Sequence, residues 1–534
     1  MSGLLVLTWL LPLCATLLSQ YRLGAWWVPV APLGGLIAAL ILPIGGQLDI
    51  DWLLLGVSLH LDAIGQTFLL FSSTLWLFAG CYATLTMRTK AHFGRFSLFF
   101  LLACSGNLLL IVAADIVTFY LGFALMGLAA TGMILHPRSQ RARRGARIYL
   151  LWTLVGELAL FSAIVLLAHN LDSLRFSALT TQVLTGTTAA LLLFGFGIKL
   201  ALPGLHFWLP LTYPVAPAAA AAVLSGPMIS AGLLGWLRFL SPGNAMLISW
   251  GEGLLVIGVI GTTLGVLAGL LQRHPRAVLA YSSIAKMGLV TTIFGLALAK
   301  PAVAPEIIAA LVVFAMHHLM LKGTLFLLLG EWLRQGARVW ITLTIGILAL
   351  AMIGVPLTSG AGAKLMLKGA VAQSGVSLTM LFGFSVLGTL FLMAKLLWLV
   401  ARRPVTKEPA FDYSGISVIG FAAIAVLLPL SQMPLPMHLS GIGTIIAGLI
   451  MIAVFIVIRR NISFSMPTIS QGDLLYLFYT VPRLCCGRIS WRDFTLSPYT
   501  LLLVNTDAIT ARAPGALIWL ALCVSFLTLA LMPR

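Results

Sequence analysis

Ionisable side chains lie inside the hydrophobic stretches of this 534-residue chain, where membrane helices normally carry only apolar residues. They are five lysines and one glutamate: Lys199, Lys286, Lys322, Lys364, Lys395 and Glu157. A charge at the centre of a bilayer costs at least ~2.5–3.5 kcal/mol, so each needs a partner, a water-filled cavity or a function. Because desolvation favours the uncharged form of a lysine, buried lysines can exchange protons near neutral pH. The set therefore predicts a path for protons or other ions.

The composition indicates an all-α integral membrane protein. Only 9% of the residues are charged and 60% are hydrophobic, whereas soluble domains carry about 25% charged residues. Hydrophobic runs long enough to cross a bilayer recur along the whole chain. We predict sixteen spans: 3–19, 25–44, 63–87, 96–113, 115–135, 148–168, 187–209, 216–240, 248–271, 277–298, 305–332, 339–370, 378–401, 415–432, 441–458 and 515–532. Glu157 is the one acid that we place in the interior of a span.

The net charge of +18 follows the predicted topology. Of the 32 basic residues, 22 fall in loops after odd-numbered spans, including five arginines between residues 136 and 147. Loops on the other side hold only Arg175, Arg238 and Lys300. The positive-inside rule then places both termini outside a bacterial inner (plasma) membrane. The basic excess indicates no nucleic-acid partner, and the lipid bilayer is the expected surroundings.

Redox and nucleotide chemistry have no motif in this chain. The six cysteines are scattered, and Cys485 and Cys486 lack the spacing of a metal or redox pair. Neither a dinucleotide fingerprint nor a P-loop is present. We expect no cofactor, no metal and no catalytic chemistry of the chain's own, so energy must come from an ion gradient or partner subunits. A place in an ion-translocating oxidoreductase stays open.

Two spans contain helix-breaking residues next to a lysine. Lys199 precedes Pro203 and Gly204, and Lys364 follows the break around Pro356. Interrupted membrane helices mark binding sites in transporters. Both lysines are therefore candidates, together with His206 in the first broken stretch.

A histidine and a lysine share one helix face in the stretch AMHHLMLKGTLF. His318 and Lys322 are four residues apart, whereas His317 points about 100° away. Both can titrate near neutral pH once desolvated, which favours a proton relay. Lys286 and His317 are further candidates for the path. Lys395 could instead extend toward the arginines at the cytoplasmic end of its span.

Several stretches resemble the antiporter-like subunits shared by respiratory complex I, Mrp-type Na⁺/H⁺ antiporters and membrane-bound hydrogenases. The matching stretches are SGNLLLIVAADIVTFYLG, GIKLALPGLHFWLP, APAAAAAVLSGPMISAG, HPRAVLAYSSIAKMG, HHLMLKGTLFLLLG and GVPLTSGAGAK. The resemblance implies two inverted five-helix repeats, each with a broken helix. It implies proton-path roles for Lys199 in a first half-channel, His318 and Lys322 in a central link, and Lys395 in a second half-channel.

The sequence departs from the family pattern at three positions. Ala124 stands where the family has the glutamate that partners the first-channel lysine, Ser230 replaces a lysine or histidine, and Phe314 replaces a histidine. Glu157 matches an acid that relatives often carry in the sixth span. It is a possible counter-charge for Lys199.

We divide the chain into N-terminal helices (1–113), an antiporter-like core (114–400) and C-terminal helices (401–534), the last with a cytoplasmic amphipathic segment at 460–513. The predicted function is proton translocation, or exchange of H⁺ for a cation. Expected partners are other membrane subunits and a soluble or redox partner. One alternative is proton-coupled inorganic-carbon uptake with a zinc-containing soluble partner. Another is a structural subunit that has lost pumping.

Overall fold

The computed structural model describes residues 3–19, 24–53, 56–171, 173–179, 184–405, 413–433, 443 and 445–451. The chain divides into two compact units, one of residues 1–49 and 58–472 and the other of residues 50–57 and 473–534. The helices and the candidate site belong to the first unit. The predicted span 515–532, the predicted segment 460–513 and the cysteine pair at 485–486 lie outside the described residues.

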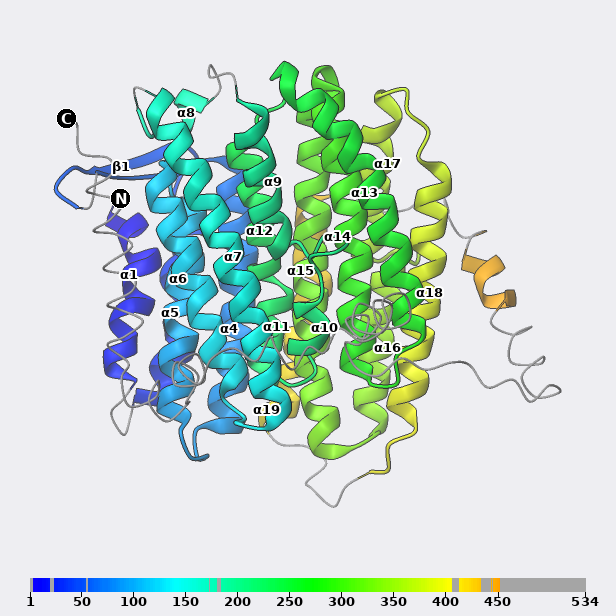
Figure 1. Cartoon of the computed structure of the whole chain (residues 1–534). Coiled ribbons are helices and arrows are strands. Elements are labelled where there is room, and N and C mark those ends of the chain that lie inside the picture. Colours follow the sequence, from blue (N-terminus) through cyan, green and yellow to red (C-terminus); the bar gives the residue numbers. More distant parts are fainter. Residues whose placement is uncertain are drawn as a thin grey trace, which may run out of the picture. The chain divides into compact units, whose positions relative to one another are not determined.

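Helices form nearly all of the regular structure in the described residues (Figure 1). The helices before the first break are α1 (Gly3–Leu18), η1 (Gly24–Trp26), α2 (Trp27–Val30), α3 (Leu33–Ile41), α4 (Ala63–Met87), α5 (Phe93–Val112), α6 (Ile116–Leu135), α7 (Gln140–Asn170), α8 (Phe176–Leu179) and α9 (Gly186–Lys199). Those that follow it are α10 (Trp208–Thr212), α11 (Ala218–Ser225), α12 (Pro227–Phe239), α13 (Ala245–Leu270), α14 (Pro275–Ala299), η2 (Pro301–Val303), α15 (Ala304–Gln335), α16 (Val339–Ile353), α17 (Ser359–Gln373), α18 (Thr379–Ala401), α19 (Tyr413–Leu427) and η3 (Leu428–Gln432).

Eleven helical segments of the described chain are long and apolar enough to cross a membrane, and α1, α9 and α16 are shorter apolar helices. The first fourteen predicted spans coincide with these segments. The fifteenth, 441–458, is described only in part. The protein is therefore an α-helical membrane protein, as its composition predicts.

Both predicted helix breaks are present. After α9 ends at Lys199, the backbone is irregular up to α10, and Ala201 and Gly204 adopt φ values of 56° and 83°. Between α16 and α17, Gly354 and Leu357 have φ values of 81° and 68°. These left-handed conformations end each first half-helix, so that backbone groups and a lysine are left together inside the bundle.

The structure corrects the sequence expectation in two places. The predicted span 216–240 is two helices, because Pro227 lacks an N–H and begins α12 directly after Gly226. A Cβ on Gly226 would lie 2.4 Å from the side chain of Leu75, so a larger residue at this third break would displace that leucine. Residues between the second and third spans form two paired strands, β1 (Gly46–Ile50) and β2 (Val57–Leu61), which the all-helical expectation missed.

Helices α13 and α14 pack closely, and α15 packs on α14, α11, α4 and α17. Small residues permit the close approach of α13 to α14: a Cβ on Gly288 would lie 2.3 Å from the backbone nitrogen of Thr262. Figure 1 shows α14 and α15 between the helices of the first break and those of the second. Lys286 and Lys322 lie on these two helices, α14 and α15.

Candidate functional site

Lys199 is the last residue of α9 and is only 4% exposed. Its Nζ donates a hydrogen bond of 2.8 Å to the hydroxyl of Tyr149 on α7. The same Nζ lies 4.8 Å from the ring centroid of Tyr149 and 5.7 Å from that of Phe123. Aromatic faces attract a cation, and the carboxyl end of a helix does so too. The groups around Lys199 are therefore ones that attract a cation.

The carboxylate of Glu157, on α7, and the ammonium of Lys199 both lie next to Gly127 of α6. A Cβ built on Gly127 of α6 would lie 3.2 Å from Glu157 Oε1 and 3.3 Å from Lys199 Nζ. Glu157 is 7% exposed, and its carboxylate oxygens accept no hydrogen bond from the described residues. Ala124 lies one turn before Gly127 on the same face of α6. An acid of α7 thus approaches the face of α6 that carries Ala124 and Gly127.

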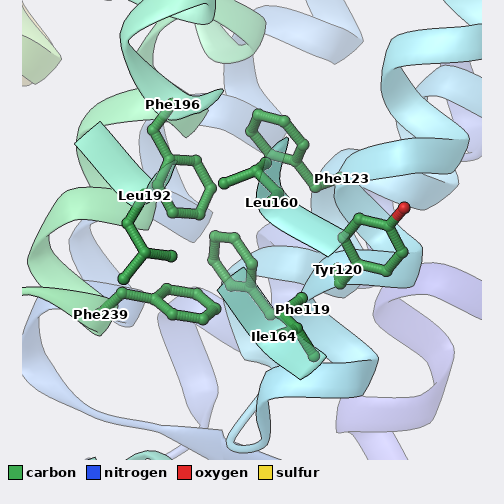
Figure 2. Close-up of a pocket in the computed structure, with 8 residues that line it drawn as sticks. All are labelled: Phe119, Tyr120, Phe123, Leu160, Ile164, Leu192, Phe196 and Phe239. Carbon is green, nitrogen blue, oxygen red and sulfur yellow. The ribbon is translucent and has the colours of Figure 1, made fainter. Parts of the chain in front are cut away.

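Apolar side chains fill the bundle on the other side of Lys199. Figure 2 shows them converging from α6, α7, α9 and α12: Phe119, Tyr120, Phe123, Leu160, Ile164, Leu192, Phe196 and Phe239. The space between these side chains is too small for a water molecule. Phe196 is one turn before Lys199 on α9, so the lysine is closed off toward the amino end of its own helix. Tyr149 and Glu157 leave the opposite side polar.

Lys322 and Lys286 occupy the centre of the described bundle. Lys322 is fully buried, and its Nζ donates to the backbone oxygen of Leu279 on α14 at 2.9 Å. Lys286 is 2% exposed, and its Nζ donates to Ser385 Oγ on α18 at 3.1 Å. Both ammonium groups therefore rest on neutral oxygens. Lys286 ties α14 to the second half of the chain.

Lys286 has a more central place than the family's path residues suggest. It lies close enough to interact electrostatically with His317, His318, Lys322 and Lys364. Within the described part of the chain, Nδ1 of His317 and Nε2 of His318 have no hydrogen-bond partner. These ring nitrogens could therefore form hydrogen bonds with water.

His206 follows the first break and is 1% exposed. Its ring lies 4.6 Å from that of Phe207 and 6.5 Å from that of Tyr281 on α14, measured between centroids. The residue thus lies close to α14, the helix that carries Lys286. It is the predicted candidate placed best to connect the first break to the centre.

The two lysines of the second half lie at different places in the helices. Lys364 Nζ donates to the backbone oxygen of Ile353, the last residue of α16, and so lies at the second break. Lys395 Nζ donates to the backbone oxygen of Leu270 at 2.6 Å, at the carboxyl end of α13. Lys395 is half-buried, and only five residues separate it from the end of α18 at Ala401.

A second buried acid went unnoticed in the sequence. Glu331, near the end of α15, has no exposed surface, so Glu157 is not the single buried acid of the spans. Its Oε1 accepts from Arg334 at 2.8 Å and from Ser414 at 2.9 Å, and its Oε2 accepts from Gln335 at 2.9 Å. The pairing of Glu331 with Arg334 at i and i+3 was the signal available in the sequence. Ser414 is the second residue of α19, so this network attaches α19 to α15.

Two ionisable groups next to helix ends have structural partners. The guanidinium of Arg238 donates two hydrogen bonds of 2.7 Å to Asp62, which caps α4. Burial would raise the pKa of Asp62, but the hydrogen bonds and charge of Arg238 outweigh it and lower that pKa. At the opposite ends of the helices, burial and the nearby charge of Arg276 lower the pKa of His274 to about 4. In the part of the chain that the structure describes, no three His, Cys, Asp or Glu side chains gather as metal ligands.

The family called "NADH:quinone oxidoreductase/Mrp antiporter, TM" matches residues 113–391. The chain belongs to this family. The match contains both helix breaks and four of the five buried lysines, and it ends just before Lys395. The protein is thus an antiporter-like membrane protein related to complex I.

Relatives cover this chain in part. An uncharacterized protein of Mycobacterium tuberculosis is 34% identical over 46% of this chain and 40% of its own length. Hydrogenase-4 component B of Escherichia coli is 26% identical over 51% of this chain and 42% of its own length. The chain therefore spans less than half the length of these relatives. A chain of respiratory complex I from Thermus thermophilus is 20% identical and superimposes with a TM-score of 0.70, covering 80% of this chain and 95% of that one. This likeness shows a shared fold.

Proposed function

We propose that this chain translocates protons, or exchanges H⁺ for a cation, as one membrane subunit of a multisubunit complex. One observation carries the proposal. The carboxylate of Glu157 and the ammonium of Lys199 come from different helices and face one point beside Gly127, at a helix break. A buried lysine with a nearby acid can gain a proton from one side and pass it on when a neighbouring charge changes.

The buried cations beyond this pair supply a continuation of the path. Lys286, Lys322, His317 and His318 interact at the centre, and Lys364 interacts with two of them. Lys286, Lys322 and Lys364 each donate to a neutral oxygen, and none of them forms an ion pair with a described residue. His206 would connect Lys199 to this centre. The two breaks support a division into two inverted repeats, with α9–α10 and α16–α17 in corresponding positions.

The rival function is a scaffold that has lost pumping, and Ala124 favours it. A carboxylate at that position would face Lys199 directly, as the family pattern implies. The position of Glu157 offsets this loss, because the acid approaches the same face of α6. A scaffold also has no need of five lysines in hydrophobic helices, where each is costly.

The test is proton movement in vesicles that contain the assembled complex. Lys199→Ala and Lys322→Ala should reduce proton flux to the background of empty vesicles while assembly stays normal. Lys199→Arg should fail nearly as completely, because a guanidinium stays charged and cannot hand on its proton. Lys300→Ala, at an exposed loop lysine, is the matched control and should retain full flux. Full activity in Lys199→Ala and Lys322→Ala would assign both lysines a structural role.

A further inference from the structure

Helix α7 begins with a group of exposed arginines, at the end that the charge asymmetry places in the cytoplasm. Arg141, Arg143, Arg144 and Arg147 all lie in its first turns and are exposed. With 3.6 residues per turn, the last three lie within about 100° of the helix circumference. The sequence contains no acid between Asp115 and Glu157. Among the residues that the structure describes, neither Arg143 nor Arg147 has an ion-pair partner.

The arrangement of these arginines is electrostatically unfavourable within the chain. Arg143 and Arg147 are four residues apart, and Arg144 and Arg147 are three apart, so like charges face each other on neighbouring turns. The amino end of a helix also carries the positive end of its dipole, which favours negative groups and opposes positive ones. An anion bound among the guanidinium groups would relieve both repulsions.

Five other arginines at the helix ends expected in the cytoplasm are held by the protein itself. Three lie over tryptophan rings and two donate hydrogen bonds: Arg88 over Trp26, Arg402 over Trp398, Arg403 over Trp332, Arg334 to Glu331 and Arg276 to the backbone oxygen of Ala216. A cytoplasmic position by itself therefore does not require an arginine to extend into solvent without a protein partner. The group on α7 has the charge and the exposure that a partner outside the chain would need.

Large apolar side chains continue the same face of α7 toward the middle of the membrane. Leu151, Leu154, Val155 and Leu158 are 61%, 44%, 38% and 66% exposed. Together with the arginines they lie within about 120° of the helix circumference. Leu151 and Leu158 are ~10 Å apart along the helix axis, which fits within the ~15 Å hydrocarbon depth of one leaflet. The face thus presents positive charge and then apolar surface, in the order that complements the headgroup and acyl chains of an anionic phospholipid.

We propose that the exposed face of α7 binds an anionic phospholipid of the cytoplasmic leaflet. The guanidinium groups of Arg143, Arg144 and Arg147 bind the phosphate, for which the planar fork of arginine is well suited, and an acyl chain lies along Leu151 and the apolar residues after it. A free phosphate would leave those apolar side chains uncovered. The opposite face of α7 carries Tyr149, whose hydroxyl accepts the hydrogen bond from Lys199. The lipid would therefore contact the helix that positions Lys199, although the proposal itself does not depend on proton translocation.

The first test identifies the molecule that touches this face. Leu151 is replaced by the photoreactive amino acid p-benzoylphenylalanine, and the assembled complex is irradiated in vesicles of equal amounts of phosphatidylglycerol and phosphatidylcholine. Mass spectrometry of the cross-linked peptide should show phosphatidylglycerol at least threefold in excess. The same replacement at Ile260, which is 50% exposed on α13 at a similar distance from the cytoplasmic end, is the control and should give a ratio near one. A ratio near one at Leu151, or cross-linking there to protein instead of lipid, would overturn the proposal.

The second test removes the charge and keeps the apolar face. In the same assay, combined substitution of Arg143, Arg144 and Arg147 by glutamine should bring the ratio at Leu151 to about one, whereas substitution of the three by lysine should keep most of the excess. Arg138 and Arg141 stay in place, so the loop remains basic and the orientation of α7 is preserved. An unchanged excess in the glutamine variant would refute the role of the arginines.

Inorganic phosphate separates a lipid headgroup from a free anion. Added to the otherwise unchanged photoreactive variant, phosphate should lower the excess at Leu151 no more than sodium chloride of equal ionic strength, which acts by screening alone. A much stronger effect of phosphate would show that the arginines form a site for the free anion, and would overturn the assignment to a phospholipid.

Discussion

Removing the charge of Glu157 tests the acid–lysine pair most directly. Lys199 Nζ and Glu157 Oε1 lie 3.3 Å and 3.2 Å from the position that a Cβ on Gly127 would occupy. The two atoms are therefore at most roughly 6.5 Å apart. Two unit charges at that distance attract by about 2.5 kcal/mol at an effective dielectric constant of about 20. A free energy of 1.4 kcal/mol corresponds to about a tenfold change in an equilibrium constant. Glu157→Gln should therefore weaken proton binding to Lys199 by a factor of roughly 50 or more.

The expected result is a large loss of turnover with little loss of protein. Glutamine has nearly the shape of glutamate, and the carboxylate accepts no hydrogen bond from the described residues, so folding should be affected little. Proton flux in vesicles, monitored with a trapped pH-sensitive dye and normalised to assembled complex, measures the effect. Glu252→Gln on the exposed face of α13 is the matched control.

A second substitution sharpens the prediction. Ala124→Glu places an acid on α6, one turn from Gly127, and in the Glu157→Gln background it should restore part of the flux. Rescue would establish that a negative charge near Lys199 is what matters. Normal turnover in Glu157→Gln alone would refute the counter-charge role, and a loss of assembled complex without loss of specific turnover would assign Glu157 to helix packing.

Further predictions concern topology and stability. A cysteine introduced between residues 136 and 147 should be labelled only from the cytoplasm and one at Lys300 only from outside; the reverse pattern would contradict the orientation. Because Arg238 lowers the pKa of Asp62, this pair stabilises the fold above the ordinary carboxyl pKa and loses its contribution as pH falls through the lowered value. Asp62→Asn should therefore reduce the melting temperature at pH 7 and remove this part of the acid sensitivity; an unchanged melting temperature at pH 7 would disprove it. Glu331→Gln should cost about 1–3 kcal/mol of stability and expose α19 to protease, with turnover per intact complex unchanged.

The membrane class and the helix breaks followed from the sequence alone. Runs of apolar residues of bilayer length fix the number of helices closely, because the backbone must satisfy its hydrogen bonds within each segment. Proline and glycine beside Lys199 and Lys364 identified two breaks, since these residues cannot continue a helix or can leave it at no steric cost. The Gly226–Pro227 break was missed because alanines on either side resemble one helix. The pairing of residues 46–50 with 57–61 was missed because a short hairpin has little hydrophobic pattern.

The neighbours of each charged group were decided only by the tertiary structure. Helical periodicity states which residues share a face, as with His318 and Lys322, but it does not state which helices face each other. The approach of Glu157 to Lys199 depends on how α6, α7 and α9 pack around Gly127. The central place of Lys286 depends on α18 presenting Ser385 to α14. These contacts join residues far apart in the chain, and close packing of whole helices, rather than any local pattern, brings them together.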